Sequence, residues 1–244
     1  EQRDVEEQMA ILEKTGYPAT ALVIEAWSDE ATFYIWNGAQ YRVKPGEESF
    51  QESDFTFCEP WPNPKKMIDE LHLRGIKLVL WQIPALKKLD AGQICPQHDA
   101  DDAYAVENSL VVKNADNSPY RIPKQWFVGS HVPDFSSPQL RKWWMDKRNY
   151  LMEMGVDGFK TDGGEFIHDL DVRFHNCQSG VTMRNRYVAD YEETYAEAIG
   201  SERTLFSRAG YLGAQACPIH WAGDQASTFQ ELRSVLGAGL SLGL

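Results

Sequence analysis

The chain has 244 residues, of which 43% are hydrophobic, so it can bury a sizeable core in one large α/β domain. Its net charge of −12 argues against a nucleic-acid partner, for which a basic surface is expected. No apolar run reaches the length of a membrane span, which argues against a membrane protein. No signal peptide opens the sequence, which slightly favours the cytoplasm but leaves the location unknown.

The first third of the chain alternates between helix-like and strand-like segments. Residues 3–15 have apolar side chains near helical spacing and stop at a glycine, which predicts a helix. The apolar run 20–27 predicts the first buried strand, and 33–58 has the composition of a loop with short extended pieces. Residues 64–74 and 76–81 then predict a second helix and a second strand, the rhythm of a parallel sheet.

The middle of the chain interrupts this rhythm. Residues 85–125 are polar and rich in turn signals, and they are too long for a simple connection, so we predict an inserted loop or subdomain at the mouth of the fold. A third strand is expected at 125–128. Ser137 is placed to cap a helix over 138–154, with Pro138 at its first position.

The remaining sequence continues the alternation to its end. It predicts a strand over 156–159, a helix over 187–199, strands over 204–208 and 219–224, a helix over 228–236 and the start of a seventh strand at 239–242. Six or seven such units indicate a (β/α)₈ TIM barrel that is incomplete, because complete barrels need about 250 residues without insertions. We therefore expect residues 1–244 to form a single barrel domain, truncated at its C-terminal end.

Three charged residues end or follow predicted strands, where catalytic groups of such barrels gather. They are Asp162, Arg208 and Asp224. Two carboxylates facing one pocket are the minimum equipment for glycoside hydrolysis. Each could instead be an ordinary turn or cap residue, since Asp and Gly dominate turns and Asp162 precedes two glycines. Taken together, the three favour a catalytic site.

Metal ligands are not grouped in the sequence. The four cysteines are far apart and form no CxxC pair, so neither a zinc motif nor a disulfide framework is indicated. His131 and His220 belong to no cluster with ligand spacing. Asp99, Asp101 and Asp102 lack the full calcium-loop pattern and are interpreted as a solvated acidic loop.

Several motifs resemble those of glycoside hydrolase family 31, the retaining α-glucosidase and α-xylosidase family, from about residue 20 onward. The matching pieces are Phe159-Lys160-Thr161-Asp162 with Glu165, Arg208-Ala209-Gly210, His220-Trp221-Ala222-Gly223-Asp224, and Asp134-Phe135-Ser136-Ser137-Pro138 followed by Trp143-Trp144. The resemblance implies a catalytic barrel in which Asp162 is the nucleophile and Asp224 the acid/base, with the two carboxyl groups ~5–5.5 Å apart. It implies that the −1 sugar site is lined by Arg208 and Trp221, and further by Lys160, Trp126, Trp81, Trp27 and Glu165. No metal or organic cofactor is implied.

Two departures from the family pattern leave the sugar open. The segment F-K-T-D-G-G-E stands where α-glucosidases have W-I-D-M-N-E, and the acidic residue typical of their first strand looks replaced around Ala26–Ser28. The family's flanking β-domains are also missing, so we expect the isolated segment to be unstable or inactive and the functional protein to be longer.

The function expected from the resemblance is a retaining exo-α-glycosidase acting on α-glucosides of an oligosaccharide. An α-xylosidase, an α-galactosidase or a transglycosylase on the same site remains an alternative, as does a carbohydrate-binding barrel without catalysis. A metal-dependent sugar isomerase would need more His and carboxylate ligands at strand ends than the sequence offers. A homo-oligomer is possible.

Overall fold

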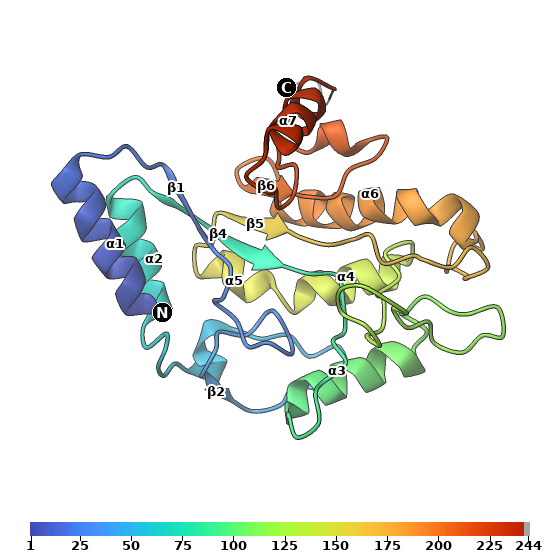
Figure 1. Ribbon diagram of the computed structural model, residues 1–244. Coiled ribbons are helices and arrows are strands. Elements are labelled where there is room, and N and C mark those ends of the chain that lie inside the picture. The colour runs from blue at the N-terminus through green and yellow to red at the C-terminus, as the bar shows by residue number, and fades with distance from the viewer. Residues whose placement is uncertain (242–244) are drawn as a thin grey trace.

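The computed structural model describes residues 1–241. At its centre is a five-stranded sheet in the order β1-β4-β5-β6-β7, in which every neighbouring pair is parallel. The strands are β1 (Ala21–Ile24), β4 (Lys77–Gln82), β5 (Gly158–Thr161), β6 (Thr204–Ser207) and β7 (Ile219–His220). Strands that follow one another in this order, with helices between them, form part of a (β/α)₈ barrel, as predicted (Figure 1).

Helices cover the sheet where the sequence supplies a cap and an apolar face. The main ones are α1 (Gln2–Thr15), α2 (Pro64–Leu73), α4 (Pro138–Asp146), α5 (Asn149–Glu153) and α6 (Gly180–Ile199). Asn63 caps α2 and Ser137 caps α4 by accepting backbone N–H groups, and each helix has proline at its first position. The long helix α6 packs on β5 and β6, and α4 packs on α6 (Figure 1). In the described part of the chain, no helix is both long and apolar enough to span a membrane.

Shorter elements fill the long connections. β2 (Gln40–Tyr41) and β3 (Phe55–Thr56) form a small antiparallel pair beside η1 (Glu52–Asp54), η2 (Ala214–Ala216) precedes β7, and α3 (Pro96–Glu107) lies within the span 85–125. Asp99, Asp101 and Asp102 lie on this helix, which corrects the expectation of a solvated acidic loop. Asp101 is buried on α3, with Lys147 3.3 Å away and a 2.6 Å hydrogen bond from the hydroxyl of Tyr34.

The core is densest under the central strands. β4 and β5 are largely buried, and Phe159 of β5 lies edge-on against Tyr195 of α6, with 5.4 Å between the ring centroids. By contrast, β1 alternates between exposed and half-buried residues because it is an edge strand of this sheet. The first strand was predicted to be buried, and that prediction is wrong.

Other boundaries also differ from the expectation. Residues 125–128 form a turn instead of a strand, and α7 (Phe229–Ser241) continues through 239–241, where a seventh strand was expected; Leu242 lies outside the described residues. The expected helix over 138–154 is divided into α4 and α5. α6 begins at Gly180, earlier than predicted, because the polar first turns of this helix carry little apolar periodicity.

Candidate active site

Asp162 directly follows β5 and is held from three sides. The indole Nε1 of Trp81 donates to its Oδ2 at 2.9 Å, and the guanidinium Nη1 of Arg208 lies 2.8 Å from its Oδ1. The backbone N–H of Gly163 donates to the same Oδ1 at 2.8 Å. Because these donors come from β4 and from the residues that follow β5 and β6, the parallel register of the sheet fixes the carboxylate in one orientation.

The two glycines after Asp162 let the chain turn away from the carboxylate. Gly163 has φ +73° and Gly164 φ +101°, in the left-handed region that favours glycine. A Cβ atom on Gly163 would also lie 2.5 Å from the side chain of Ile83. The D-G-G sequence is therefore required by close packing beside the carboxylate as well as by the turn.

Arg208 connects Asp162 to a second acidic residue. Its Nη2 donates to Glu165 at 2.8 Å while its Nη1 faces Asp162, and its Cζ lies 5.5 Å from the ring centre of Trp126. Burial by itself lowers the pKa of Arg208, but Glu165 and the charges of Asp162 and Asp224 outweigh it and raise the pKa. A permanent cation therefore lies against Asp162, close enough to Asp224 for the two charges to interact.

Lys160 lies on β5, two residues before Asp162, and forms a second polar group of the site. Its ammonium pairs with Glu25, which follows β1, and lies 4.4 Å from the ring centre of Trp221. Trp221 in turn packs against Phe206, with 4.6 Å between centroids. The ion pair directs the ammonium group toward the end of the first strand, and the cation–π contact holds it from the side of β7.

A cavity of about 760 Å³ opens above these strand ends. Six of the predicted site residues line it: Lys160, Asp162, Arg208, Asp224, Trp81 and Trp126. The other three do not. Trp221 contacts Lys160, and Glu165 accepts a hydrogen bond from Arg208, so both support residues that line the cavity. Trp27 corrects the expectation that it faces the pocket: it is fully buried and donates its indole N–H to the backbone oxygen of Trp81 at 3.0 Å.

Other lining residues escaped the sequence analysis. Glu25 supplies an acidic group just after the first strand, because β1 ends at Ile24, earlier than the apolar run suggests. Phe33 and Phe127 form an aromatic wall with Trp81 and Trp126, and both have φ of +58°. This left-handed backbone conformation is uncommon for phenylalanine, and it directs both rings to the cavity. A sequence pattern does not reveal such a conformation.

Together these groups place two carboxylates, a fixed arginine and an aromatic wall around one cavity at the carboxyl ends of parallel strands. That is the equipment of an enzyme that cleaves glycosidic bonds on a barrel. The chain belongs to glycoside hydrolase family 31: the model of its TIM-barrel domain, described as "Glycosyl hydrolases family 31 TIM-barrel domain", matches residues 1–244.

The relatives with high similarity include two proteins named for isomaltosyl groups. The chain is 44% identical to an isomaltosyltransferase from Sporosarcina globispora and 42% identical to a 1,3-alpha-isomaltosidase from Kribbella flavida, in each case over 92% of this chain. It spans 21% and 31% of the lengths of those proteins.

Solved structures are similar over nearly the whole chain. A cycloalternan-forming enzyme from Listeria monocytogenes, in complex with a pentasaccharide substrate, superposes with a TM-score of 0.94 at 41% identity, over 99% of this chain and 23% of that one. A cycloalternan-degrading enzyme from Trueperella pyogenes gives 0.92 at 39%, over 98% and 34%.

Proposed function

We propose that the protein is a retaining α-glycosidase that acts on terminal α-linked glucosyl or isomaltosyl units of oligosaccharides, with Asp162 as nucleophile and Asp224 as acid/base. The observation that carries the proposal is the fixing of both Asp162 oxygens at a strand end that shares its cavity with Asp224. A binding barrel without catalysis would have no need of this pair.

In the first step, one Asp162 oxygen attacks the anomeric carbon and forms a glycosyl ester, while the bond from that carbon to the leaving oxygen breaks. The Asp224 carboxyl group gives its proton to the leaving oxygen. Arg208 and Trp81 hold the attacking carboxylate through 2.8 and 2.9 Å contacts, so little reorganisation is needed before attack.

In the second step, Asp224 removes a proton from an acceptor hydroxyl, which attacks the same carbon and releases Asp162. The two displacements occur at the same carbon from opposite faces and each inverts it, so the product keeps the α configuration. A water acceptor gives hydrolysis and a sugar hydroxyl gives transfer. Both belong to the proposal, because the relatives include an isomaltosyltransferase and an isomaltosidase.

The lining of the cavity supports a sugar ligand. Trp81, Trp126 and Phe127 offer aromatic faces to a sugar ring, and the Lys160–Glu25 pair offers charged hydrogen-bonding groups to its hydroxyls. The relatives favour glucosyl units over xylosyl units. The isomaltosyltransferase and the isomaltosidase are 44% and 42% identical to the chain, whereas the alpha-xylosidase from Emericella nidulans is 30% identical. An α-galactoside stays an alternative for the experiment to test.

Azide rescue in the full-length protein tests the two roles. The substrates are the 4-nitrophenyl α-glycosides of isomaltose, glucose, xylose and galactose, assayed with Asp162→Ala and Asp224→Ala. Azide should attack the substrate of Asp162→Ala directly and give a β-glycosyl azide. With Asp224→Ala it should intercept the glycosyl-enzyme and give an α-glycosyl azide. The same anomer from both variants, or full activity in either, would contradict the assignment.

A further inference from the structure

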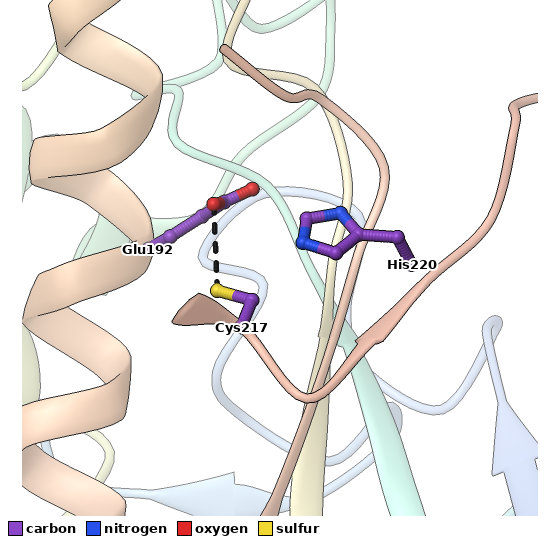
Figure 2. Close-up of side chains that lie close together, drawn as sticks. All are labelled: Glu192, Cys217 and His220. Carbon is purple, nitrogen blue, oxygen red and sulfur yellow. Dashed lines mark hydrogen bonds between the residues drawn. The ribbon is translucent and has the colours of Figure 1, made fainter. Parts of the chain in front are cut away.

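A carboxyl group, a thiol and an imidazole meet on the outer side of the sheet, away from the residues that line the catalytic cavity. Glu192 comes from α6, Cys217 directly follows η2, and His220 ends β7. One ligand atom of each lies within 4.8 Å of the others. Figure 2 shows the carboxyl group and the thiol in contact and the edge of the imidazole facing both.

The largest charge effects on the acidic groups of this cluster are negative. Glu192 is 3% exposed, and burial raises its pKa to about 8, against hydrogen bonds from Cys217 and Ser207. The charges with the largest effect on it, Glu165 and Glu193, are negative and raise the pKa further. Burial likewise raises the pKa of Cys217 to about 12, and Glu192 adds to the shift. In such a place an ionised carboxylate needs a bound cation beside it, whereas the protonated form does not.

We infer that Glu192, Cys217 and His220 form a binding site for a thiophilic divalent cation, of which Zn²⁺ is the representative. A thiol and an imidazole are poor ligands for Ca²⁺ or Mg²⁺, which take oxygen, but they suit zinc. The Cys217 sulfur lies 3.4 Å from the Glu192 oxygen. That separation matches the roughly 3.5 Å expected between sulfur and oxygen ligands of tetrahedral zinc, with bonds of about 2.3 and 2.0 Å.

The protons balance as follows when the cation binds. Cys217 loses its thiol proton, and Glu192 loses its proton where it carries one, so binding weakens as the pH falls. Nε2 of His220 contacts the backbone oxygen of Ala214 at 2.7 Å. It becomes a ligand when its proton moves to Nδ1, at the cost of that hydrogen bond, and water takes the fourth position.

The position of the cluster indicates a structural role. His220 precedes Asp224 by four residues, so a bound cation would tie the segment carrying Asp224 to α6. Sequence spacing could not reveal the site, because Glu192 is 25 residues before Cys217 and only the packing of α6 brings them together.

Cobalt substitution in the full-length protein, freed of affinity tags and of metal, tests this inference. Titration with Co²⁺ should saturate at one equivalent for this site and produce the near-ultraviolet charge-transfer absorption of a cobalt–thiolate bond, which Zn²⁺ then abolishes. Cys217→Ala should remove the absorption, and His220→Gln should weaken Co²⁺ binding at least tenfold. The matched control is Cys177→Ala, which removes an exposed cysteine outside the cluster and should change nothing.

Two results would overturn the inference. One is the absence of cobalt–thiolate absorption in the unmodified protein, which does not depend on how any variant folds. The other is absorption that persists in Cys217→Ala but disappears in Cys177→Ala, which would place the metal on the exposed thiol.

Discussion

The two ends of β5 carry an aspartate each, and the two residues do opposite things. At the start, Asp157 accepts hydrogen bonds from the backbone N–H of Leu78 at 2.9 Å, from Lys77 at 2.9 Å and from the ring of His72 at 2.7 Å. At the end, Asp162 is equally well bonded, but it faces a cavity of about 760 Å³.

The difference lies in where the partners come from and what is left open. The partners of Asp157 belong to α2 and β4, and they close the bottom of the sheet. The partners of Asp162 orient the carboxylate and leave space above it for a substrate. In a parallel barrel the strand's amino end serves stability and its carboxyl end serves chemistry. Substitutions at the two ends should therefore separate activity from stability.

The largest expected effect is on turnover in Asp162→Ala. Without the nucleophile no glycosyl ester forms, so kcat should fall by about 10⁴-fold or more. The free energy of unfolding should change far less, because the site is open to water on one side. Steady-state kinetics and urea unfolding of the full-length protein measure the two quantities. A surface control is Asp99→Asn on α3, whose side chain is 66% exposed. Turnover near that of the control would remove Asp162 from the mechanism.

The second effect depends on the leaving group. Asp224→Ala should reduce kcat/KM for a natural disaccharide by about 10²- to 10⁴-fold, since its poorly departing oxygen needs a proton. Formation of the glycosyl-enzyme from a 4-nitrophenyl glycoside should be reduced much less. The pre-steady-state release of nitrophenol distinguishes the two cases, and equal losses for both substrates would contradict an acid role.

Arg208→Lys should have a smaller effect, a loss of about 10²-fold in kcat. Lysine keeps the charge but cannot present two N–H groups to Asp162 and Glu165 in the same geometry. KM should change less, because the arginine acts on the nucleophile. Glu165→Gln is the matched variant: it keeps an acceptor for Arg208 and should retain more activity. If KM rises while kcat is unchanged, Arg208 binds the substrate directly.

The sequence was sufficient where a short apolar strand is followed within a few residues by a charged residue. Asp162, Arg208 and Asp224 were predicted to face one pocket, and all three line the cavity. The predicted helices at 3–15 and 64–74 are confirmed, because cap and stop residues bound them. These signals are local in the sequence, and the parallel sheet then brings the residues at the strand ends together.

The sequence was insufficient where three-dimensional packing decides. Trp27 looked like a strand end facing the pocket, but the strand ends three residues earlier and the ring turns under β4. Trp126 was placed on a strand, whereas a turn with positive φ at Gln125 and Phe127 presents it. Asp101 looked solvated until α3 packed it against Lys147. Each error concerns a side chain whose environment comes from a distant segment.

At the other end of β5, Asp157→Asn should lower stability and spare catalysis. The amide keeps one acceptor oxygen but brings N–H groups toward other donors, at a cost of about 1–3 kcal/mol in the free energy of unfolding. Most of this loss in stability comes from the hydrogen bonds with Leu78 and His72, because Lys77 is 64% exposed and its ion pair is weak. Urea unfolding at neutral pH measures the loss. A kcat below that of Asp99→Asn at low temperature would show that the two ends of β5 are coupled.

The smallest expected effect is the pH dependence of the stability lost in Asp157→Asn. Burial raises the pKa of Asp157, but the hydrogen bonds from Leu78, His72 and Lys77 outweigh it and leave the pKa below its ordinary value. A carboxyl group with a lowered pKa in the folded state stabilises the protein above its unfolded pKa of about 3.9, and this contribution disappears as the pH falls through the folded value. The stability difference between the unmodified protein and Asp157→Asn should therefore be constant near neutral pH and shrink below about pH 4. A difference that persists in full at lower pH would mean that Asp157 acts through shape alone, and that its charge contributes nothing to closing the bottom of the sheet.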